Sequence, residues 1–154
     1  MFNLPKRSVC VDASFLLQLL VEAKWTRQAE SLWAQWCEAE VNLIAPTLLY
    51  YEICNILHQQ VRHNDLLPEE AQSALEMVSV FKITFYGDIL LHYQAARLAR
   101  NLELSATYDA HYLALCEKYG VEFWTADKRL YNSVHSALPW VHLLQESEVD
   151  CHLP

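Results

Sequence analysis

The sequence predicts an α/β fold: a central, mostly parallel sheet of about five short strands, covered by helices on both faces. Short apolar segments alternate with longer segments of helical periodicity along the chain, and strands that alternate with helices form parallel sheets. The length of 154 residues fits a single domain that can bury a substantial core. We expect that core over about residues 8–144, followed by a polar C-terminal tail, 145–154.

The predicted strands are short apolar runs bounded by residues that end or cap elements. The first is followed by Asp12, the second is ended by Pro46, and the third is closed by Gly87. The third run alternates enough to be an edge strand. The predicted strands are 8–11, 42–45, 82–86, 121–125 and 140–143.

The intervening segments are predicted to be helices. The helix after the first strand is apolar nearly all round, so we expect it to be covered on more than one side. Pro68 followed by two glutamates is typical of a helix start, and Gly120 is typical of a helix end. The predicted helices are about 14–23, 26–40, 47–62, 68–80, 89–101, 105 or 107 to 119, and 127–135.

Composition excludes some classes of protein. The only glycines are Gly87 and Gly120, so no glycine-rich phosphate loop can be built. Nicotinamide dehydrogenases and P-loop ATPases are therefore poor candidates. The formal net charge of −8 disfavours an extended basic face for nucleic acid. If nucleic acid is the substrate, its contacts must be few and local, or metal ions must supply the positive charge.

No apolar run approaches the roughly 18 residues that span a bilayer, and the N-terminus has no apolar signal region after its basic residues. We therefore expect a cytoplasmic protein without a membrane partner. The five cysteines are odd in number and lack C-x-x-C spacing, which indicates mainly buried, reduced thiols.

Four carboxylates occupy suggestive positions. Asp12 and Asp127 follow predicted strands, and Glu52 and Asp109 lie in apolar helical segments. Strand ends and the starts of the following helices share one edge of a parallel sheet, where ligands bind. Glu52 points along an apolar helix face, so it must be paired, neutral or bound to a metal. Converging carboxylates repel one another, and a divalent cation that prefers oxygen ligands, Mg²⁺ or Mn²⁺, would relieve that repulsion.

Structural explanations exist for the same residues. Asp12 and Asp127 are favoured helix caps, worth about 1 kcal/mol each, and Asp109 suits the first turn of a helix. Hydroxyl and amide groups near the acids can orient metal-bound water or serve only as caps; these supporting residues are Ser14, Asn55 and Thr125. The adjacent pair Lys128 and Arg129 is either a phosphate contact at the rim of the site or a solvated helix start.

Four stretches of this chain carry a resemblance to a known family: Val9–Ser14, Pro46–Leu57, Thr107–Leu115 and Phe123–Leu130. In this order and spacing they resemble the PIN-domain ribonucleases, and especially the VapC-type toxins of bacterial or archaeal toxin–antitoxin pairs. The resemblance extends in order and spacing from Val9 to Leu143. Two departures, His111 and Cys116, stand where smaller residues are usual and lie outside the acidic pattern.

The resemblance implies a metal-dependent endoribonuclease. In that family, acids matching Asp12, Glu52, Asp109 and Asp127 hold one or two Mg²⁺ or Mn²⁺ ions, which activate water for attack on an RNA phosphodiester. The supporting polar positions match Ser14, Asn55 and Thr125. The resemblance also implies a small antitoxin partner, which inserts an arginine into the acidic pocket, and a homodimer contact.

The residues themselves also predict an interface. The composition is unusually apolar, the first helix is apolar on nearly every side, and Trp33 and Trp36 lie one turn apart. A single domain of this size is not expected to bury all of these side chains. We therefore expect a contiguous exposed apolar patch that marks an interface.

Three rival functions remain open. An Asp-dependent phosphatase of the haloacid-dehalogenase type wants a second aspartate two residues after Asp12, where this chain has Ser14. A receiver-like signalling module leaves Glu52 unexplained. The third rival is a PIN-like fold kept for partner binding, with weak or no nuclease activity.

Overall fold

The computed structural model describes residues 7–145, and its centre is a five-stranded parallel sheet with the strand order β3-β2-β1-β4-β5. Every neighbouring pair of strands is parallel. The predicted α/β fold with a parallel sheet is confirmed. The strands are β1 (Ser8–Val11), β2 (Asn42–Pro46), β3 (Thr84–Tyr86), β4 (Glu122–Thr125) and β5 (Val141–Leu143).

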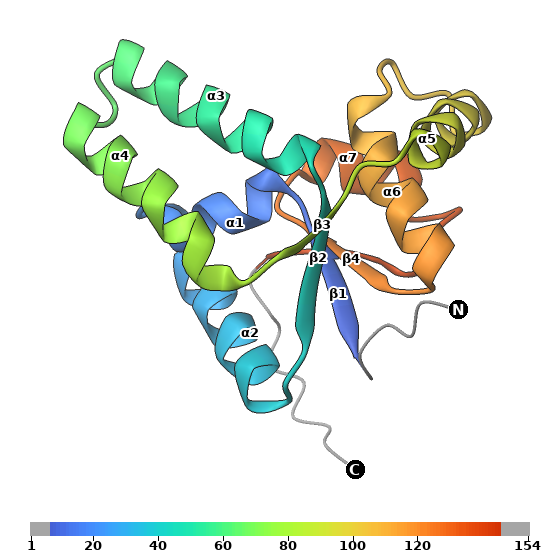
Figure 1. Cartoon of the computed structure of the whole chain (residues 1–154), viewed down its shortest axis with the longest axis horizontal. Helices are drawn as coiled ribbons and strands as arrows, with labels where there is room; N and C mark the ends of the chain where they lie inside the picture. Colours follow the sequence, from blue (N-terminus) through green and yellow to red (C-terminus); the bar gives the residue numbers. More distant parts are fainter. Residues whose placement is uncertain (1–6, 146–154) are drawn as a thin grey trace.

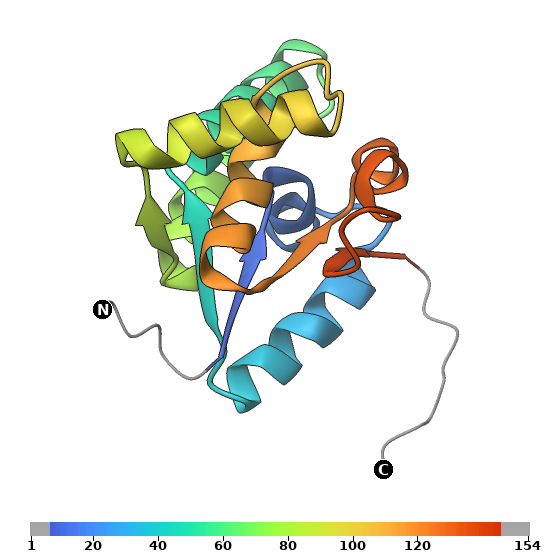
Figure 2. The same ribbon diagram turned by 90° about the vertical axis from the view of Figure 1, so that its right-hand side faces the viewer.

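Helices cover both faces of the sheet, as predicted. Figure 1 shows α1 to α4 on one side of the sheet and α5 and α6 on the other. In Figure 2, α6 crosses in front of the sheet and α5 lies over the upper end of α6. Within the described residues, the helices are α1 (Ala13–Leu20), α2 (Thr26–Glu38), α3 (Leu48–Arg62), α4 (Pro68–Met77), α5 (Ile89–Asn101), α6 (Tyr108–Tyr119) and α7 (Lys128–Val134).

Several element boundaries differ from the predicted ones. The predicted strand 82–86 begins only at Thr84, because Lys82 has a left-handed backbone (φ 49°). The helix predicted to reach residue 40 ends at Glu38, and Glu40 is also left-handed (φ 52°). The helix predicted to end near Val80 gives way to a 3-10 turn, Val78–Phe81. The polar tail predicted beyond Gln145 lies outside the described residues.

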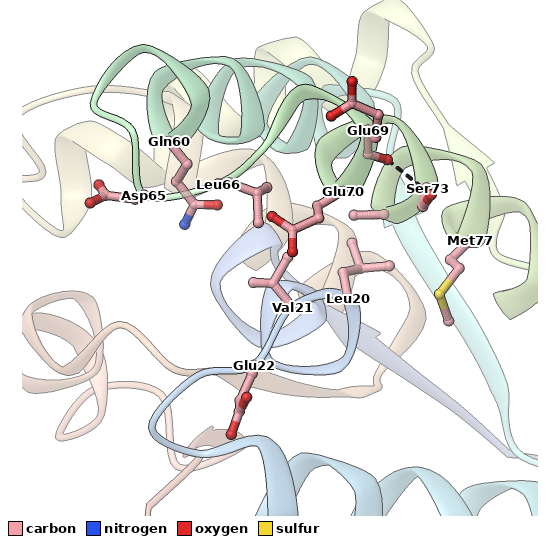
Figure 3. Close-up of a pocket in the computed structure, with 11 residues that line it drawn as sticks. Leu20, Val21, Glu22, Gln60, Asp65, Leu66, Glu69, Glu70, Ser73 and Met77 are labelled. Atoms are coloured by element: carbon pink, nitrogen blue, oxygen red, sulfur yellow. Dashed lines mark hydrogen bonds between the residues drawn. The ribbon is translucent and has the colours of Figure 1, made fainter.

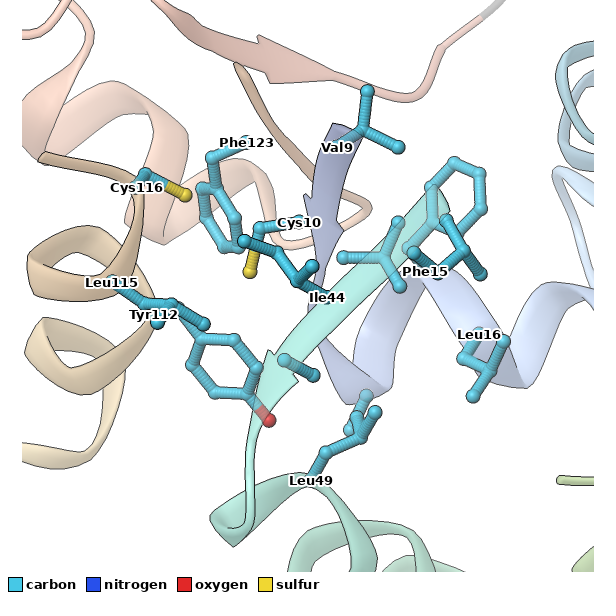
Figure 4. Close-up of a cluster of buried hydrophobic side chains, with 14 of the residues drawn as sticks. Val9, Cys10, Phe15, Leu16, Ile44, Leu49, Tyr112, Leu115, Cys116 and Phe123 are labelled. Carbon is cyan, nitrogen blue, oxygen red and sulfur yellow. The ribbon is translucent and has the colours of Figure 1, made fainter. Parts of the chain in front are cut away.

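The core fills the space on both sides of β1. Figure 4 shows side chains from β1, β2, α1 and α6 packed together there. Trp36 stacks on Phe15 with ring centroids 5.4 Å apart, and Trp33 packs edge-on against Phe81 at 4.9 Å. Trp36 is buried and Trp33 is half-buried, so these side chains contribute little to the exposed apolar patch that the composition led us to expect.

Large exposed apolar side chains come instead from other helices. Examples are Tyr51 on α3, Leu90 and Tyr93 on α5, and Tyr108 on α6. Among the described cysteines, Cys10 and Cys116 are buried, as expected, but Cys37 and Cys54 are exposed, because each lies on the outer face of its helix. None of the helices in the part of the chain that the structure describes is long and apolar enough to cross a membrane.

Candidate active site

Asp12 lies at the junction of β1 and α1, where only 6% of the residue is exposed. It caps α1 by accepting a hydrogen bond from the Phe15 backbone amide at 2.9 Å. Because Val11 pairs with Trp124 in the sheet, the next residues along the two strands bring Asp12 beside Thr125. Its carboxylate accepts hydrogen bonds from the hydroxyls of Thr125 and of Ser14, the latter at 2.6 Å.

The protons of these two hydroxyls are directed at Asp12. The Ser14 hydroxyl accepts from the Ala126 amide at 2.8 Å, and the Thr125 hydroxyl accepts from the Asp127 amide at 3.0 Å. A hydroxyl has a single proton, so each donates that proton to the carboxylate. Ser14 and Thr125 therefore fix Asp12 in place.

Burial strongly affects the charge of Asp12. Removal from water raises the pKa of Asp12 to about 6, and repulsion from Asp109 adds to the rise. The hydrogen bonds from Ser14, Thr125 and the Phe15 amide act in the opposite direction, because they favour the ionised form.

Glu52 projects from the first half of α3 toward α6, and the Tyr112 hydroxyl donates a hydrogen bond to its carboxylate. In Figure 4 the Tyr112 ring lies in the core with its oxygen directed toward α3. Burial raises the pKa of Glu52 to about 7, and repulsion from Asp12 and Asp109 contributes. Sequence reasoning missed Tyr112, although its position three residues after Asp109 puts both on one face of α6.

Asp109 and Asp127 lie on either side of one arginine. The Arg129 Nη2 atom is 3.9 Å from Asp109 Oδ2 and 3.8 Å from Asp127 Oδ2. Asp127 also caps α7 by accepting from the amides of Arg129 and Leu130. Burial raises the pKa of Asp109, repulsion from Asp127 adds to it, and Arg129 counteracts both. The guanidinium thus partly neutralises this pair of acids.

Mutual repulsion connects the four carboxylates. The charges of Asp12 and Asp109 raise the pKa of Glu52, and the charge of Asp109 raises the pKa of Asp12. The charge of Asp127 raises the pKa of Asp109. The fold thus gathers acids from β1, α3, α6 and the end of β4 at one edge of the sheet. Two predicted residues stand apart from these contacts: Asn55 is exposed one turn beyond Glu52, and Lys128 is exposed at the start of α7.

The residues present fit a hard divalent cation in their chemistry. All four side chains offer oxygen ligands. Burial is the main cause of the raised pKa values of Asp12 and Glu52, and repulsion from neighbouring carboxylates adds to it. Among the residues that the structure describes, however, no three His, Cys, Asp or Glu side chains already form a complete metal-binding group. Arg129 supplies the positive charge beside Asp109 and Asp127.

Comparison with known proteins defines the class to which this fold and site belong. The model of the PIN domain family matches residues 9–134, so the chain belongs to the PIN domain family. Within that family it is similar to ribonuclease VapC3 of Pyrobaculum aerophilum, with 33% identity over 124 residues. The match covers 78% of this chain and 89% of that relative.

Solved structures agree on the fold. VapC20 of Mycobacterium tuberculosis, a toxin that cleaves the sarcin–ricin loop, has a TM-score of 0.63 and 19% identity over 82% of this chain and 95% of that one. VapBC2 of Rickettsia felis, bound to a DNA fragment from its promoter, has a TM-score of 0.64 and 8% identity. The match covers 88% of this chain and 96% of that one. A toxin–antitoxin complex from Klebsiella pneumoniae has a TM-score of 0.58 and 15% identity. The match covers 90% of this chain and 99% of that one.

Proposed function

We propose that this protein is a metal-dependent endoribonuclease and the toxin component of a toxin–antitoxin pair. Membership of the PIN domain family and the similarity to a VapC ribonuclease support the class of activity. The observation that carries the proposal is the placement of Asp12, Glu52 and Asp109, which come from separate elements and lie close enough for their charges to affect one another. Such a cluster of carboxylates destabilises the folded protein, and clusters of this kind are typical of functional sites, where a bound cation would offset the repulsion.

In this proposal Asp12, Glu52, Asp109 and Asp127 hold Mg²⁺ or Mn²⁺, with Asn55 as a further polar group. A bound divalent cation supplies an activated water and stabilises the charge that develops on the RNA phosphate. The hydrogen bonds from Ser14 and Thr125 keep Asp12 in one orientation, and Tyr112 does the same for Glu52. Arg129, beside two of the acids, and exposed Lys128 are positioned to bind an RNA phosphate at the rim.

We also propose an antitoxin partner, which a cleft of about 780 Å³ between α1, α3 and α4 supports. Figure 3 shows the cleft, with the C-terminal end of α1 facing residues of α3 and α4. Its apolar wall includes Leu20, Leu66 and Met77. Its charged groups are all acidic: Glu22, Asp65, Glu69 and Glu70. A basic amphipathic segment matches this combination.

The cleft and the candidate active site lie at opposite ends of α1. Asp12 caps its N-terminal end and Leu20 is its last residue, so the two regions are roughly 12 Å apart along the helix axis. We propose that a partner segment bound in the cleft continues past α1 and places an arginine at the carboxylates. A guanidinium there would displace the cation and block RNA access.

A homodimer is the third part of the proposal. Three large apolar side chains, Ile89, Leu90 and Tyr93, are exposed on the first turns of α5. Spacings of three and four residues put Tyr93 beside each of the other two on one helix surface. Exposed apolar surface of this kind is typical of a protein interface.

The nuclease proposal is tested by incubating the purified protein with defined RNAs in Mg²⁺, Mn²⁺ or EDTA. We expect cleavage with either metal, none in EDTA, and none for Asp12→Asn in any buffer. The matched control is Asp65→Asn, which changes an acid outside the carboxylate cluster. Cleavage by Asp12→Asn at the wild-type rate would contradict the role of the cluster.

The alternative is a PIN protein that binds a partner and has weak or no nuclease activity. The contact of Arg129 with Asp109 and Asp127 favours it, because this arginine already neutralises part of the cluster. The phosphatase alternative is weakened by Ser14, whose hydroxyl is committed to Asp12 where that chemistry needs a carboxylate. Absence of cleavage under every metal condition, with tight binding of an antitoxin, would favour the partner-binding alternative.

A further inference from the structure

A cavity of about 260 Å³, distinct from the carboxylate cluster, opens at the C-terminal ends of β2 and β3. Its floor includes Pro46 at the end of β2, and helices α3, α5 and α6 form its walls. We call it the aromatic pocket, after the rings that line it. These rings belong to Tyr51, Tyr86, His92, Tyr108 and His111.

The aromatic pocket adjoins the candidate active site through the chain itself. Tyr51 directly precedes Glu52 on α3, and Tyr108 directly precedes Asp109 on α6. Adjacent Cα atoms are about 3.8 Å apart, so the pocket begins one residue from two of the four carboxylates. Tyr51 is 74% exposed and Tyr108 is 62% exposed, which leaves both rings accessible to a ligand.

Two imidazoles place polar atoms in an otherwise apolar wall. His111 Nδ1 lies 2.7 Å from the Thr107 carbonyl oxygen, which can only accept, so His111 Nδ1 carries the proton. In neutral His111 the Nε2 atom is then an acceptor, and His92 Nδ1, 2.9 Å away, donates to it. This leaves His92 Nε2 outside the pair, free to bond with a ligand.

We propose that the aromatic pocket binds an unpaired nucleobase of the RNA substrate, next to the phosphate held at the carboxylates. The proposal rests on the ribonuclease function proposed above. Exposed tyrosine rings stack on bases of any sequence, and unpaired bases are the usual targets of specific RNA recognition. His92 Nε2 adds a hydrogen bond to the edge of the base.

The charge of the protein favours this mode of binding. A net charge of −8 and only 11 lysines and arginines give little affinity for the RNA backbone through phosphate contacts. Contacts with the bases would add affinity that the few phosphate contacts at Arg129 and Lys128 do not supply, and the aromatic pocket offers exposed rings for them. The competing occupant is a second copy of this chain, because the exposed apolar residues of α5 lie on the same side of the sheet.

The first experiment measures binding of free nucleosides in EDTA by NMR, with the imidazole signals of His92 and His111 as reporters. Nucleosides carry no phosphate, so the result does not depend on the metal site or on nuclease activity. We expect at least one nucleoside to shift both signals saturably and Tyr51→Ala to abolish the shift. Tyr93→Ala is the matched control, since Tyr93 is similarly exposed but does not line the pocket.

The second experiment measures KM and kcat on a cleavable RNA and on the same RNA with an abasic site next to the cut. We expect Tyr51→Ala to raise KM roughly five- to a hundredfold on intact RNA, the range measured for a stacked base. On abasic RNA the substitution should have little further effect, because the base is already missing. The kcat value should change less than KM, since Tyr51 holds the substrate and is not among the four carboxylates.

These outcomes separate the two proposals. Nucleoside binding without RNA cleavage would retain the pocket and refute the ribonuclease. Cleavage with no nucleoside shift, and with equal effects of Tyr51→Ala on intact and abasic RNA, would refute the pocket. Light scattering completes the test: a dimer that Tyr51→Ala and Tyr93→Ala both dissociate, with the same loss of RNA binding, would identify this face as a subunit interface instead.

Discussion

The Tyr112 hydroxyl on α6 donates a hydrogen bond to the Glu52 carboxylate on α3, across 60 positions of sequence. The tyrosine is almost fully buried, so its position is fixed by the core. This contact lowers the pKa of Glu52, against the larger effect of burial, which raises it. Tyr112 therefore helps to keep Glu52 ionised near neutral pH.

Replacing Tyr112 with phenylalanine should shift the pH dependence of cleavage. Without the hydroxyl, the pKa of Glu52 rises above about 7, so a smaller fraction of Glu52 is ionised at pH 7. A further rise of one pH unit would reduce activity at pH 7 roughly fivefold and leave it near the wild-type level at pH 9. The measurement is a pH–rate profile, with Tyr119→Phe on the same helix as control. Parallel profiles for wild type and Tyr112→Phe would contradict this role.

The metal-free protein should become less stable as pH rises. The pKa values of Asp12 and Glu52 are about 6 and 7 in the folded protein, against ordinary values of 3.8 and 4.5. The folded state thus binds more protons than the unfolded state between about pH 4 and pH 7, so the free energy of unfolding falls through that window. We expect Tm in EDTA to fall from pH 5 to pH 8. Glu52→Gln should reduce this slope, and an unchanged slope would contradict the assignment.

Binding of Mg²⁺ or Mn²⁺ should restore the stability that the metal-free protein loses as pH rises. A cation that binds only the folded protein raises Tm in proportion to the logarithm of its concentration, and ionised carboxylates bind it better than protonated ones. The increase in Tm should therefore be larger at pH 8 than at pH 5. Scanning calorimetry at several metal concentrations measures the effect, with K⁺ at matched ionic strength as control. An equal increase at both pH values would argue against the carboxylates as the binding groups.

Asp12→Asn should separate stability from activity. Asparagine removes a buried charge and its repulsion with Asp109, so the variant should be more stable than wild type at pH 8, with Tm raised by about 2–4 °C for each kcal/mol gained. At pH 5 wild-type Asp12 is largely protonated, and the difference should shrink. Cleavage should fall by at least roughly a hundredfold, because a metal ligand is lost. A variant that is less stable than wild type at pH 8 would show that the lost hydrogen bonds outweigh the relieved repulsion.

Arg129 and its neighbour Lys128 provide a matched pair of substitutions. Arg129→Gln removes the cation beside Asp109 and Asp127, so Mg²⁺ should bind roughly two- to fivefold more tightly, as expected for the loss of an exposed ion pair. KM for RNA should rise, because a phosphate contact is lost as well. Lys128→Gln should leave the affinity for Mg²⁺ unchanged. Titration calorimetry measures the affinity of each variant for Mg²⁺. Equal effects of the two substitutions on that affinity would indicate a general charge effect.

The sequence by itself determined the fold class and the positions of the acids along it. The alternation of short apolar runs with amphipathic segments predicted the parallel sheet, because that periodicity reflects burial on both faces. Asp12 and Asp127 were predicted at helix starts and do cap α1 and α7. A cap depends on amides two or three residues away, and such local interactions can be read from a single stretch of chain.

Only the tertiary structure decided which side chains from distant segments meet. The hydrogen bond of Tyr112 to Glu52 depends on how α6 packs against α3, and the contact of Arg129 with Asp109 depends on the placement of α7 beside α6. The partial burial of Trp33, which the apolar composition did not predict, likewise depends on Phe81 in the 3-10 turn packing edge-on against it. Residue type and spacing specify which face of an element is apolar, whereas the partner of that face is fixed only when all the elements pack together.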